Sequence, residues 1–250
     1  MRMTIWFVVV AIIILVGIAT VVIRRNANPQ ISRSTNTVHV VLIGASIGQG
    51  WHLAEWPTRA KASGFTAESI PAWQFDKTEA VEEVLMRPAR KFRLTRSYIR
   101  SLLEPPPRKA NVVILKECSS YFPGDLALYK RNIEKWVSQL QANHSTVILA
   151  TVVPVTRTRA QQSPDKQECL VEYNGWVREY AKQHGIAVLD LESALRTDES
   201  GRYLRDEFAI SDGSHLNATA YAVLDDILHK TLCGTSVTEG NRQPVLAVAP

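Results

Sequence analysis

A serine flanked by glycines follows the first segment of the chain whose residues predict a β-strand. This segment, VHVVLIG at 38–44, leads into GASIGQG at 44–50, which contains Ser46. The glycines permit a strained turn and the close approach of a substrate, so the Ser46 hydroxyl would be exposed as a nucleophile. A helix starting near Trp51 would aim backbone N–H groups at a developing oxyanion. The alternative is an ordinary turn between a strand and a helix.

A second pattern, SDGSHLN at 211–217, places Asp212 three residues before His215. An aspartate at this spacing can fold back onto Nδ1 of the imidazole, which leaves Nε2 free to take a proton from a serine. Together with Ser46, the pair predicts a catalytic triad. The alternative is a capping aspartate beside a surface histidine.

The elements that must position these residues alternate along the chain. Short β-branched runs predict strands at 38–44, 64–70, 111–117, 145–153 and 186–191. Amphipathic segments predict helices at 78–86, 94–103, 126–142, 170–184 and 218 to about 232, the last capped by Asn217. Strands that are apolar on both faces and separated by helices indicate a parallel sheet covered on both sides. The prediction is a three-layer α/β/α sandwich around five parallel strands, with ligands beyond the carboxyl ends of the strands.

In the residues around Ser46, Asp212 and His215 the sequence resembles the SGNH/GDSL hydrolase family. This resemblance implies the flavodoxin-like architecture of that family. That family carries its nucleophile in a G-D-S block after the first strand, matched here by Gly44, Ser46 and Gly50. Its D-x-x-H block near the C-terminus is matched by Asp212 and His215, within DGSHLNATAY. The segments VILATVVPV at 147–155 and EYNGWVREYAKQHGIAVLDL at 172–191 also resemble the family, and the resemblance covers about 38–233.

The sequence departs from this family where the oxyanion donors are expected. Ala45 replaces the aspartate of G-D-S, and 69–78 (SIPAWQFDKT) contains no glycine for the second block. KECSSY at 116–121 replaces the G-x-N-D of the third block. Ser119 or Ser120 could supply a hydroxyl in place of the asparagine, beside Gly44 and the Ser46 backbone N–H. Losing one oxyanion donor lowers turnover by about 10²–10³.

The resemblance implies a serine hydrolase of an acyl or acetyl ester, without metal or cofactor, acting on a small ester or an acylated carbohydrate. The alternatives are a non-catalytic or weakly active binding module and a carbohydrate O-acyltransferase or deacetylase on the same scaffold. The nucleophile elbow of α/β-hydrolases fits less well, because several strands precede it and its acid and base lie on separate loops.

Other reactive or aromatic residues are expected to be structural. Cys118 is expected to be a partly buried thiol rather than a nucleophile, and Cys118, Cys169 and Cys233 permit one disulfide of open pairing. Asp190 is expected to cap a helix, and Lys77 to be solvated. The tryptophans are expected to pack in the core or at a rim, with stacking on a sugar or acyl chain as the alternative: Trp51, Trp56 and Trp73.

The charge balance argues against a domain that binds nucleic acid. The net charge is +5, but Arg2, Arg24, Arg25 and Arg33 lie before residue 34, where no acidic residue occurs. The remainder of the chain is therefore nearly neutral, and 250 residues suffice for one domain.

An uncharged apolar run, Ile5–Ile23, predicts a single-pass membrane helix. It is longer than the apolar region of a signal peptide, and Arg24-Arg25 rather than a cleavage site follow it. The predicted organisation is an anchor at 1–25, a tether at 26–37, the α/β domain at 38–233 and a loosely ordered tail at 234–250. The charges slightly favour a cytoplasmic domain. We nevertheless expect an extracytoplasmic (periplasmic) one, because a lone N-terminal anchor usually tethers an exported domain.

This orientation can be tested with reporter fusions after residue 36. An alkaline phosphatase fusion should be active and a fusion to a cytoplasmic reporter silent, because only an exported domain places the phosphatase where it folds. The reverse pattern would place the domain in the cytoplasm.

Overall fold

In the computed structural model of the chain, the described residues are 37–73, 77–87, 108–117, 126–197 and 201–234. The chain divides into two compact units, Met1–Thr37 and Val38–Pro250, and the second contains the fold described below. The predicted anchor and helix 94–103 lie outside the described residues, as do the predicted tether except Thr37 and the predicted tail except Gly234, which ends the last helix. Within the described part of the chain, no helix combines the length and the apolar character needed to span a bilayer.

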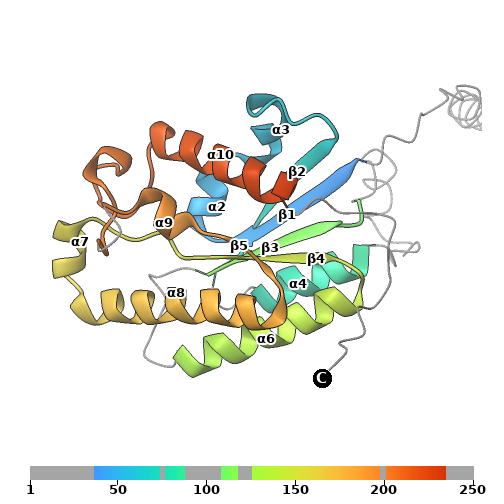
Figure 1. The fold of residues 1–250 in the computed structure, drawn as a ribbon, viewed down its shortest axis with the longest axis horizontal. Helices are drawn as coiled ribbons and strands as arrows, with labels where there is room; N and C mark the ends of the chain where they lie inside the picture. Colours follow the sequence, from blue (N-terminus) through green and yellow to red (C-terminus); the bar gives the residue numbers. More distant parts are fainter. Residues whose placement is uncertain (1–36, 74–76, 88–107, 118–125, 198–200, 235–250) are drawn as a thin grey trace, which may run out of the picture. The chain divides into compact units, whose positions relative to one another are not determined.

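The core of the second unit is a five-stranded parallel sheet in the order β2-β1-β3-β4-β5, which confirms the predicted fold class (Figure 1). Its strands are β1 (Val38–Gly44), β2 (Phe65–Pro71), β3 (Val112–Lys116), β4 (Thr146–Ala150) and β5 (Ala187–Leu189). Because β1 lies between β2 and β3, the turn that carries Ser46 emerges inside the carboxyl edge rather than at its margin.

Helices cover both faces of the sheet (Figure 1). Residues of α2 (Ser46–Gly50), α3 (Trp56–Arg59), α9 (Leu191–Leu195) and α10 (Ala218–Gly234) share one core cluster with Val40 and Leu42 of β1. Residues of α4 (Lys77–Met86), α6 (Leu126–Ala142) and α8 (Pro164–His184) share the other, with Val41 and Ile43. Alternate residues of a strand point to opposite faces, so a strand buried on both sides is apolar throughout.

The differences from the predicted elements have local causes. The short helices α2, α3, α9 and α7 (Arg157–Gln161) have only four or five residues, too few to show a helical period. Helix α8 begins at Pro164 rather than Leu170, since proline is well tolerated in a first helical turn. Strand β4 ends at Ala150, because the Asn174 side chain bonds both the N–H and the carbonyl of Val152, at 2.7 and 2.9 Å.

A buried polar junction ties α10 to the segment that follows β1. The Asp225 carboxylate accepts hydrogen bonds from Trp51 Nε1 at 2.7 Å and from Arg59 Nε and Nη2 at 2.8 and 2.9 Å. Trp56 Nε1 donates to the Asp225 carbonyl at 3.2 Å. Trp51 and Trp56 are almost completely buried, which confirms the expectation of core packing for these two.

The expectation for Lys77 is wrong. Its side chain is buried at the start of α4, and its ammonium lies 3.1 Å from the carboxylate of Glu117, which is also buried. Glu117 follows β3, so the pair lies at the carboxyl edge of the sheet. A charged side chain is rarely buried unless it is paired, and Glu117 supplies the opposite charge.

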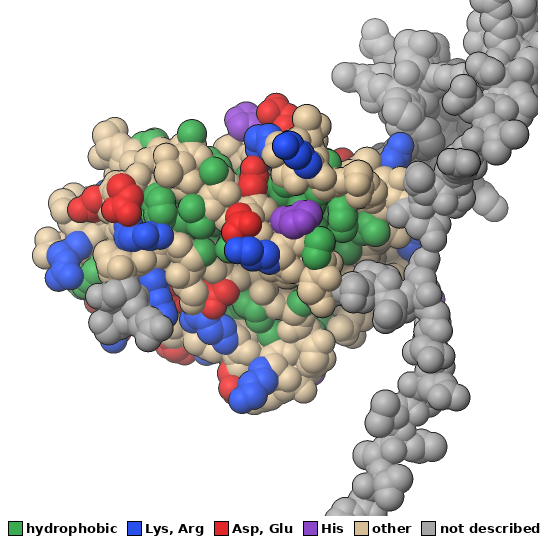
Figure 2. All heavy atoms as spheres, turned by 45° about the horizontal axis from the view of Figure 1, so that its top comes forward, with side chains coloured by type: hydrophobic (Ala, Val, Ile, Leu, Met, Phe, Trp, Pro, Cys, Tyr) green, Lys and Arg blue, Asp and Glu red, His purple; other side chains and the backbone are tan. Residues whose placement is uncertain are grey.

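Charged side chains of both signs are interspersed on the face drawn in Figure 2, without one large patch of a single sign. This distribution agrees with the nearly neutral balance of the sequence beyond residue 34.

The junction around Asp225 should dominate the stability of α10. Replacing Asp225 with Ala leaves the Trp51 N–H buried without an acceptor and Arg59 without its carboxylate, so the free energy of unfolding should fall by about 2–4 kcal/mol. The matched control is Asp226→Ala on the same helix, whose partner Lys230 is exposed. This control should change stability by no more than about 0.5 kcal/mol. Urea unfolding of both variants measures the difference, and equal losses would show that the junction contributes nothing specific.

Candidate functional site

Ser46 is the first residue of α2 and lies directly beyond the carboxyl end of β1. Ala45 precedes the helix as its buried cap residue, and its carbonyl accepts the Gln49 N–H at 3.0 Å. Ser46 itself is only partly buried. The structure therefore places the predicted nucleophile in a tight turn between a strand and a helix, on the edge where parallel sheets bind ligands.

Helix α2 is held against α10 by Tyr221, a residue that sequence reasoning did not assign to the site. The Tyr221 hydroxyl donates to the carbonyl of Ile47 at 3.3 Å. A Cβ atom on Gly50 would lie 2.4 Å from the Tyr221 hydroxyl oxygen, so a side chain there would displace the Tyr221 ring from its present position. Burial raises the pKa of Tyr221 to about 12. The signal in the sequence was the tyrosine that ends DGSHLNATAY, six residues after His215.

Asp212 and His215 are joined as their spacing predicts. The His215 Nδ1 is hydrogen-bonded to Asp212 Oδ2, and Asp212 Oδ1 accepts the backbone N–H groups of Ser214 and His215, both at 2.9 Å. Burial disfavours the charged carboxylate, but the bond to the His215 ring and the two backbone N–H groups outweigh it and hold the pKa of Asp212 well below its usual range. The carboxylate is therefore ionised at neutral pH and fixes one ring nitrogen of His215.

The loop that carries this pair is docked on the segment after β4. The Thr156 N–H donates to the carbonyl of Gly213 at 2.9 Å, and the Ile210 N–H donates to that of His215 at 3.0 Å. Gly213 has φ +69°, and a Cβ atom there would lie 2.5 Å from the Thr156 hydroxyl oxygen. Glycine is thus required both for the backbone conformation and for the close approach of the loop.

The predicted site residues are brought together to different degrees. Asp212 and His215 are in direct contact, whereas Ser46 is linked to them through the packing of α2 on α10. Within the described residues, no hydrogen bond joins Ser46 to the His215 ring. Gly44 is buried at the end of β1, where a Cβ atom would lie 3.4 Å from Cβ of Lys116. Ser119 and Ser120 lie outside the described residues, so the triad and the oxyanion donors stay predictions.

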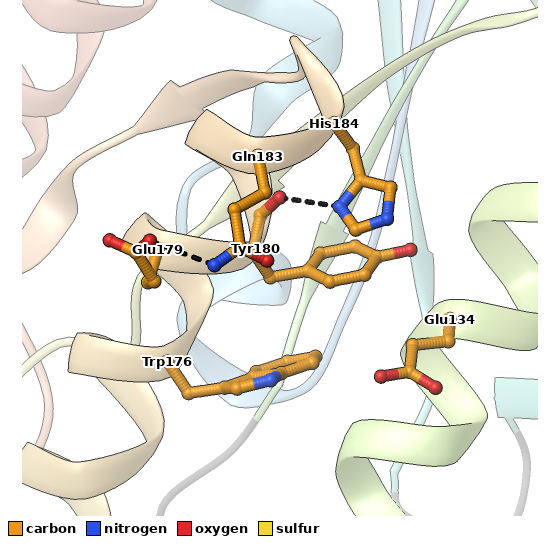
Figure 3. Close-up of a pocket in the computed structure, with 6 residues that line it drawn as sticks. All are labelled: Glu134, Trp176, Glu179, Tyr180, Gln183 and His184. Carbon is orange, nitrogen blue, oxygen red and sulfur yellow. Dashed lines mark hydrogen bonds between the residues drawn. The ribbon is translucent and has the colours of Figure 1, made fainter.

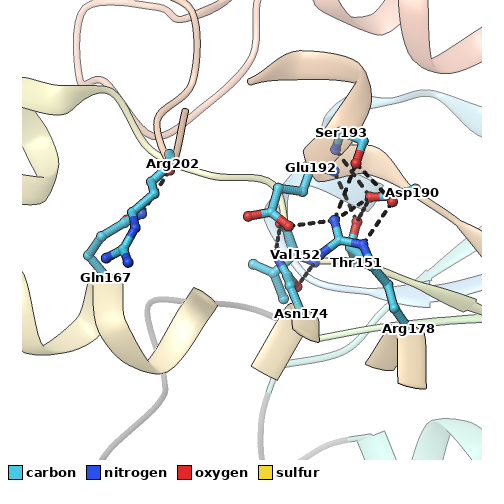
Figure 4. Close-up of polar contacts among 9 residues, drawn as sticks. All are labelled: Thr151, Val152, Gln167, Asn174, Arg178, Asp190, Glu192, Ser193 and Arg202. Carbon is cyan, nitrogen blue, oxygen red and sulfur yellow. Dashed lines mark hydrogen bonds and ion pairs between the residues drawn. The ribbon is translucent and has the colours of Figure 1, made fainter. Parts of the chain in front are cut away.

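Asp190 caps a helix, as expected, and also organises the edge of the sheet beside β4 and β5 (Figure 4). Its carboxylate accepts two bonds from Arg178, at 2.9 and 2.7 Å, one from the Thr151 hydroxyl at 3.1 Å and one from the Ser193 N–H at 3.1 Å. Arg178 also bonds Glu192 at 2.5 Å. Burial alone would raise the pKa of Asp190, but chiefly the bond from Arg178 lowers it to about 2.

His39, the histidine within β1, is held by structural partners. The ring of His39 bonds Thr66 at 2.9 Å and Glu68 at 3.2 Å, which occupies both of its nitrogens. Cys169 and Cys233 are free thiols, and Cys118 lies outside the described residues. Within the described ranges, no group of three or more histidine, cysteine and acidic side chains could hold a metal ion.

A surface hollow of about 440 Å³ lies between Glu134 of α6 and the carboxyl-terminal half of α8 (Figure 3). The Trp176 and Tyr180 rings stack with centroids 5.1 Å apart, and Tyr180 and His184 follow at 4.1 Å. Their faces therefore contact one another along α8 rather than forming an open platform. Because α8 ends just before β5, this hollow lies towards the amino ends of the strands, opposite the site.

The sequence profile of the GDSL-like lipase/acylhydrolase family matches residues 93–223, just over half of the chain. The chain therefore belongs to this family, and it is a hydrolase that acts on ester bonds. The matched span contains Asp212 and His215 and begins after Ser46. A search of the curated proteins gives no match.

Solved structures share the fold at low sequence identity. One is a GDSL-like lipase from Bacteroides thetaiotaomicron, with 17% identity and a TM-score of 0.57 over 87% of this chain and 97% of the other. A lipase/acylhydrolase from Enterococcus faecalis has 19% identity and a TM-score of 0.57 over 79% and 96% of the two chains. The acetyl xylan esterase AlAXEase has 15% identity and a TM-score of 0.53 over 78% and 100%.

The environment of Asp190 predicts a loss of stability in acid. Its folded pKa of about 2 lies below the ordinary value of 3.8. The ionised carboxylate therefore stabilises the fold above about pH 4, and this contribution is lost as the pH falls towards 2. Asp190→Asn should remove about 1–2 kcal/mol near neutral pH and flatten this part of the pH dependence. Unfolding measured from pH 2 to 7 tests this, with the exposed Asp206→Asn as the control that should retain the wild-type slope.

Proposed function

We propose that the chain hydrolyses an acyl or acetyl ester through a triad in which Ser46 is the nucleophile, His215 the general base and then acid, and Asp212 the residue that orients the imidazole. The substrate is a small ester or an acylated carbohydrate. We also propose that the domain is tethered to a membrane by Ile5–Ile23 and lies on its extracytoplasmic side. This last part rests on the sequence alone.

The observation that carries the catalytic proposal is the paired geometry of Asp212 and His215. With Nδ1 bonded to an ionised carboxylate, Nε2 is the ring nitrogen that can accept a proton. The loop leads into α10, which packs on the Ser46-bearing helix α2 through Tyr221, and we propose that this packing sets the imidazole beside Ser46. A capping aspartate beside a surface histidine would not require Nδ1 to be engaged.

The reaction then follows from the roles of these groups. Nε2 of His215 takes the Ser46 proton as Oγ bonds to the carbonyl carbon, and the carbonyl π electrons move onto the oxygen. The ester C–O bond breaks as His215 gives the proton to the leaving alcohol, which leaves an acyl ester on Ser46. Water, deprotonated by His215, attacks that ester, and the proton returns to Ser46 as the acid departs.

Stabilisation of the oxyanion is the weakest part of this site. The Ser46 N–H remains as a donor, and we propose Ser119 or Ser120 as the second. A hydroxyl rotates freely, so it is a less preorganised donor than the amide that the resemblance leads one to expect. Turnover on activated esters should therefore be slow, and a site without detectable turnover would favour the binding-module alternative.

Substitutions separate the proposed roles. Ser46→Ala and His215→Ala should each abolish hydrolysis of p-nitrophenyl acetate and labelling by a fluorophosphonate probe, because the two residues act as a unit. Asp212→Asn should fold but lose about 10⁴ in turnover, because it mis-sets the imidazole tautomer. Matched controls are Ser138→Ala, exposed on α6, and the exposed Asp206→Asn, which should keep wild-type activity.

Two outcomes would contradict the assignment. Labelling that persists in Ser46→Ala would move the nucleophile elsewhere, and full activity in Asp212→Asn would remove Asp212 from the site. Labelling absent from the wild type would favour a binding module on this scaffold.

A further inference from the structure

A small pocket adjoins the loop that carries Asp212 and His215. It has a volume of about 60 Å³ and lies between that loop, α7 and the first turns of α8; we call it the α7–α8 pocket. Ser214, which stands between Asp212 and His215, forms one wall. The bond from Thr156 to Gly213 fixes the loop against α7. A group bound in this pocket would therefore contact the residue next to His215 in the chain.

The charged side chains that line the α7–α8 pocket are cationic. Arg159 and Lys166 contribute to its walls, and the described lining contains no carboxylate. One Arg159 nitrogen donates to Gln162 Oε1 at 2.6 Å, and a guanidinium has further N–H donors. Within the described ranges, the Lys166 ammonium is paired with no carboxylate. The positive end of the α8 dipole lies at the same place, because Ser163 caps that helix and also lines the pocket.

One residue of the lining, Gln167, has a buried acceptor atom that lacks a donor. Gln167 is 6% exposed, and its Nε2 donates to the Arg202 carbonyl at 2.8 Å, which fixes the orientation of the amide (Figure 4). Its Oε1 receives no hydrogen bond within the described part of the chain. A buried acceptor left unsatisfied is unfavourable, and a hydroxyl group of a ligand would satisfy it. The apolar side chains Val155, Ala160 and Leu170 complete the lining.

We propose that the α7–α8 pocket binds an anionic group and a neighbouring hydroxyl of the ester substrate. The substrate class is then an acyl ester of an acidic, hydroxylated compound, such as a sugar acid or a sugar phosphate, rather than a neutral lipid ester. This inference rests on the proposed function, because it assigns the pocket to the substrate of that site. Arg159 and Lys166 contact the anion, and Gln167 accepts the hydroxyl.

The test compares three acetates of one sugar ring that differ in the group at C6, which is neutral in methyl glucoside and anionic in methyl glucuronide and methyl glucoside 6-phosphate; each is acetylated at the same hydroxyl. Release of acetate by the full chain gives kcat/KM for each. The wild type should prefer one or both anionic acetates, and the larger preference tells whether a carboxylate or a phosphate is the natural group. Arg159→Met and Lys166→Met should each lower kcat/KM for the preferred anionic acetate about fivefold and leave the neutral one unchanged.

Lys182→Met is the matched control, since Lys182 is exposed near the other end of α8 and does not line the pocket. It should change none of the three values. Hydrolysis of the neutral acetate that depends on Ser46, without any preference for charge, would overturn the pocket assignment and leave the proposed function intact.

A binding measurement separates the two proposals if no acetate is cleaved. Calorimetry of the Ser46→Ala chain with unacetylated methyl glucuronide and methyl glucoside 6-phosphate should show binding that Lys166→Met weakens and Lys182→Met does not. Absent binding, or equal affinity in both variants, would overturn the inference.

Discussion

The site depends on one long-range junction, the seating of α10 on the segment that follows β1. Asp225 supplies a single carboxylate to Trp51 and Arg59, and Tyr221 spans from the same helix to the carbonyl of Ile47. Ser46 and His215 are far apart in the chain, so their relative position depends on long-range contacts. A shift of α10 by even part of a helical turn would move the loop that carries His215 relative to Ser46. The buried hydrogen bonds fix the orientation of α10 on this segment, which non-directional apolar contacts alone would not do.

The sequence was sufficient to predict the layers and most of the strands. Val38–Gly44 and Leu126–Ala142 have the predicted bounds, because a strand that is apolar except for His39 and an amphipathic helix of 17 residues both carry strong signals in the sequence. The short helices α2 and α9 were not predicted, since they are too short to show a helical periodicity and are defined by tertiary packing. The burial of Lys77 was not predicted from the sequence for a similar reason. Its partner Glu117 is 40 residues away in the chain, and only the sheet brings the two together.

The local half of the site could be predicted, but its supports could not. Three-residue spacing was enough to place Asp212 on the His215 ring, because that contact closes within a single turn. Tyr221, Thr156 and Gly50 act across distances that depend on the strand order. Their roles in holding the site therefore became visible only with the fold. Gly50 illustrates this difference. Its place in the motif is evident from the sequence, but the group that crowds a side chain at this position is the hydroxyl of Tyr221, 171 residues later.

The separation between the local Asp212–His215 contact and its long-range supports explains how a partly exposed loop can hold a defined geometry. The side chains of Asp212 and His215 are 42% and 44% exposed, so burial does not hold them. Instead, one carboxylate satisfies two backbone N–H groups and the imidazole at once, which sets the loop conformation and the ring orientation together. The internal geometry of the Asp212–His215 pair is thus independent of the sheet. The rest of the fold has only to dock this preassembled unit, through Gly213 on Thr156 and through α10 on α2. Docking on the α7 side also forms the α7–α8 pocket, so the contact that supports the imidazole is the one that would align the polar end of a substrate with it.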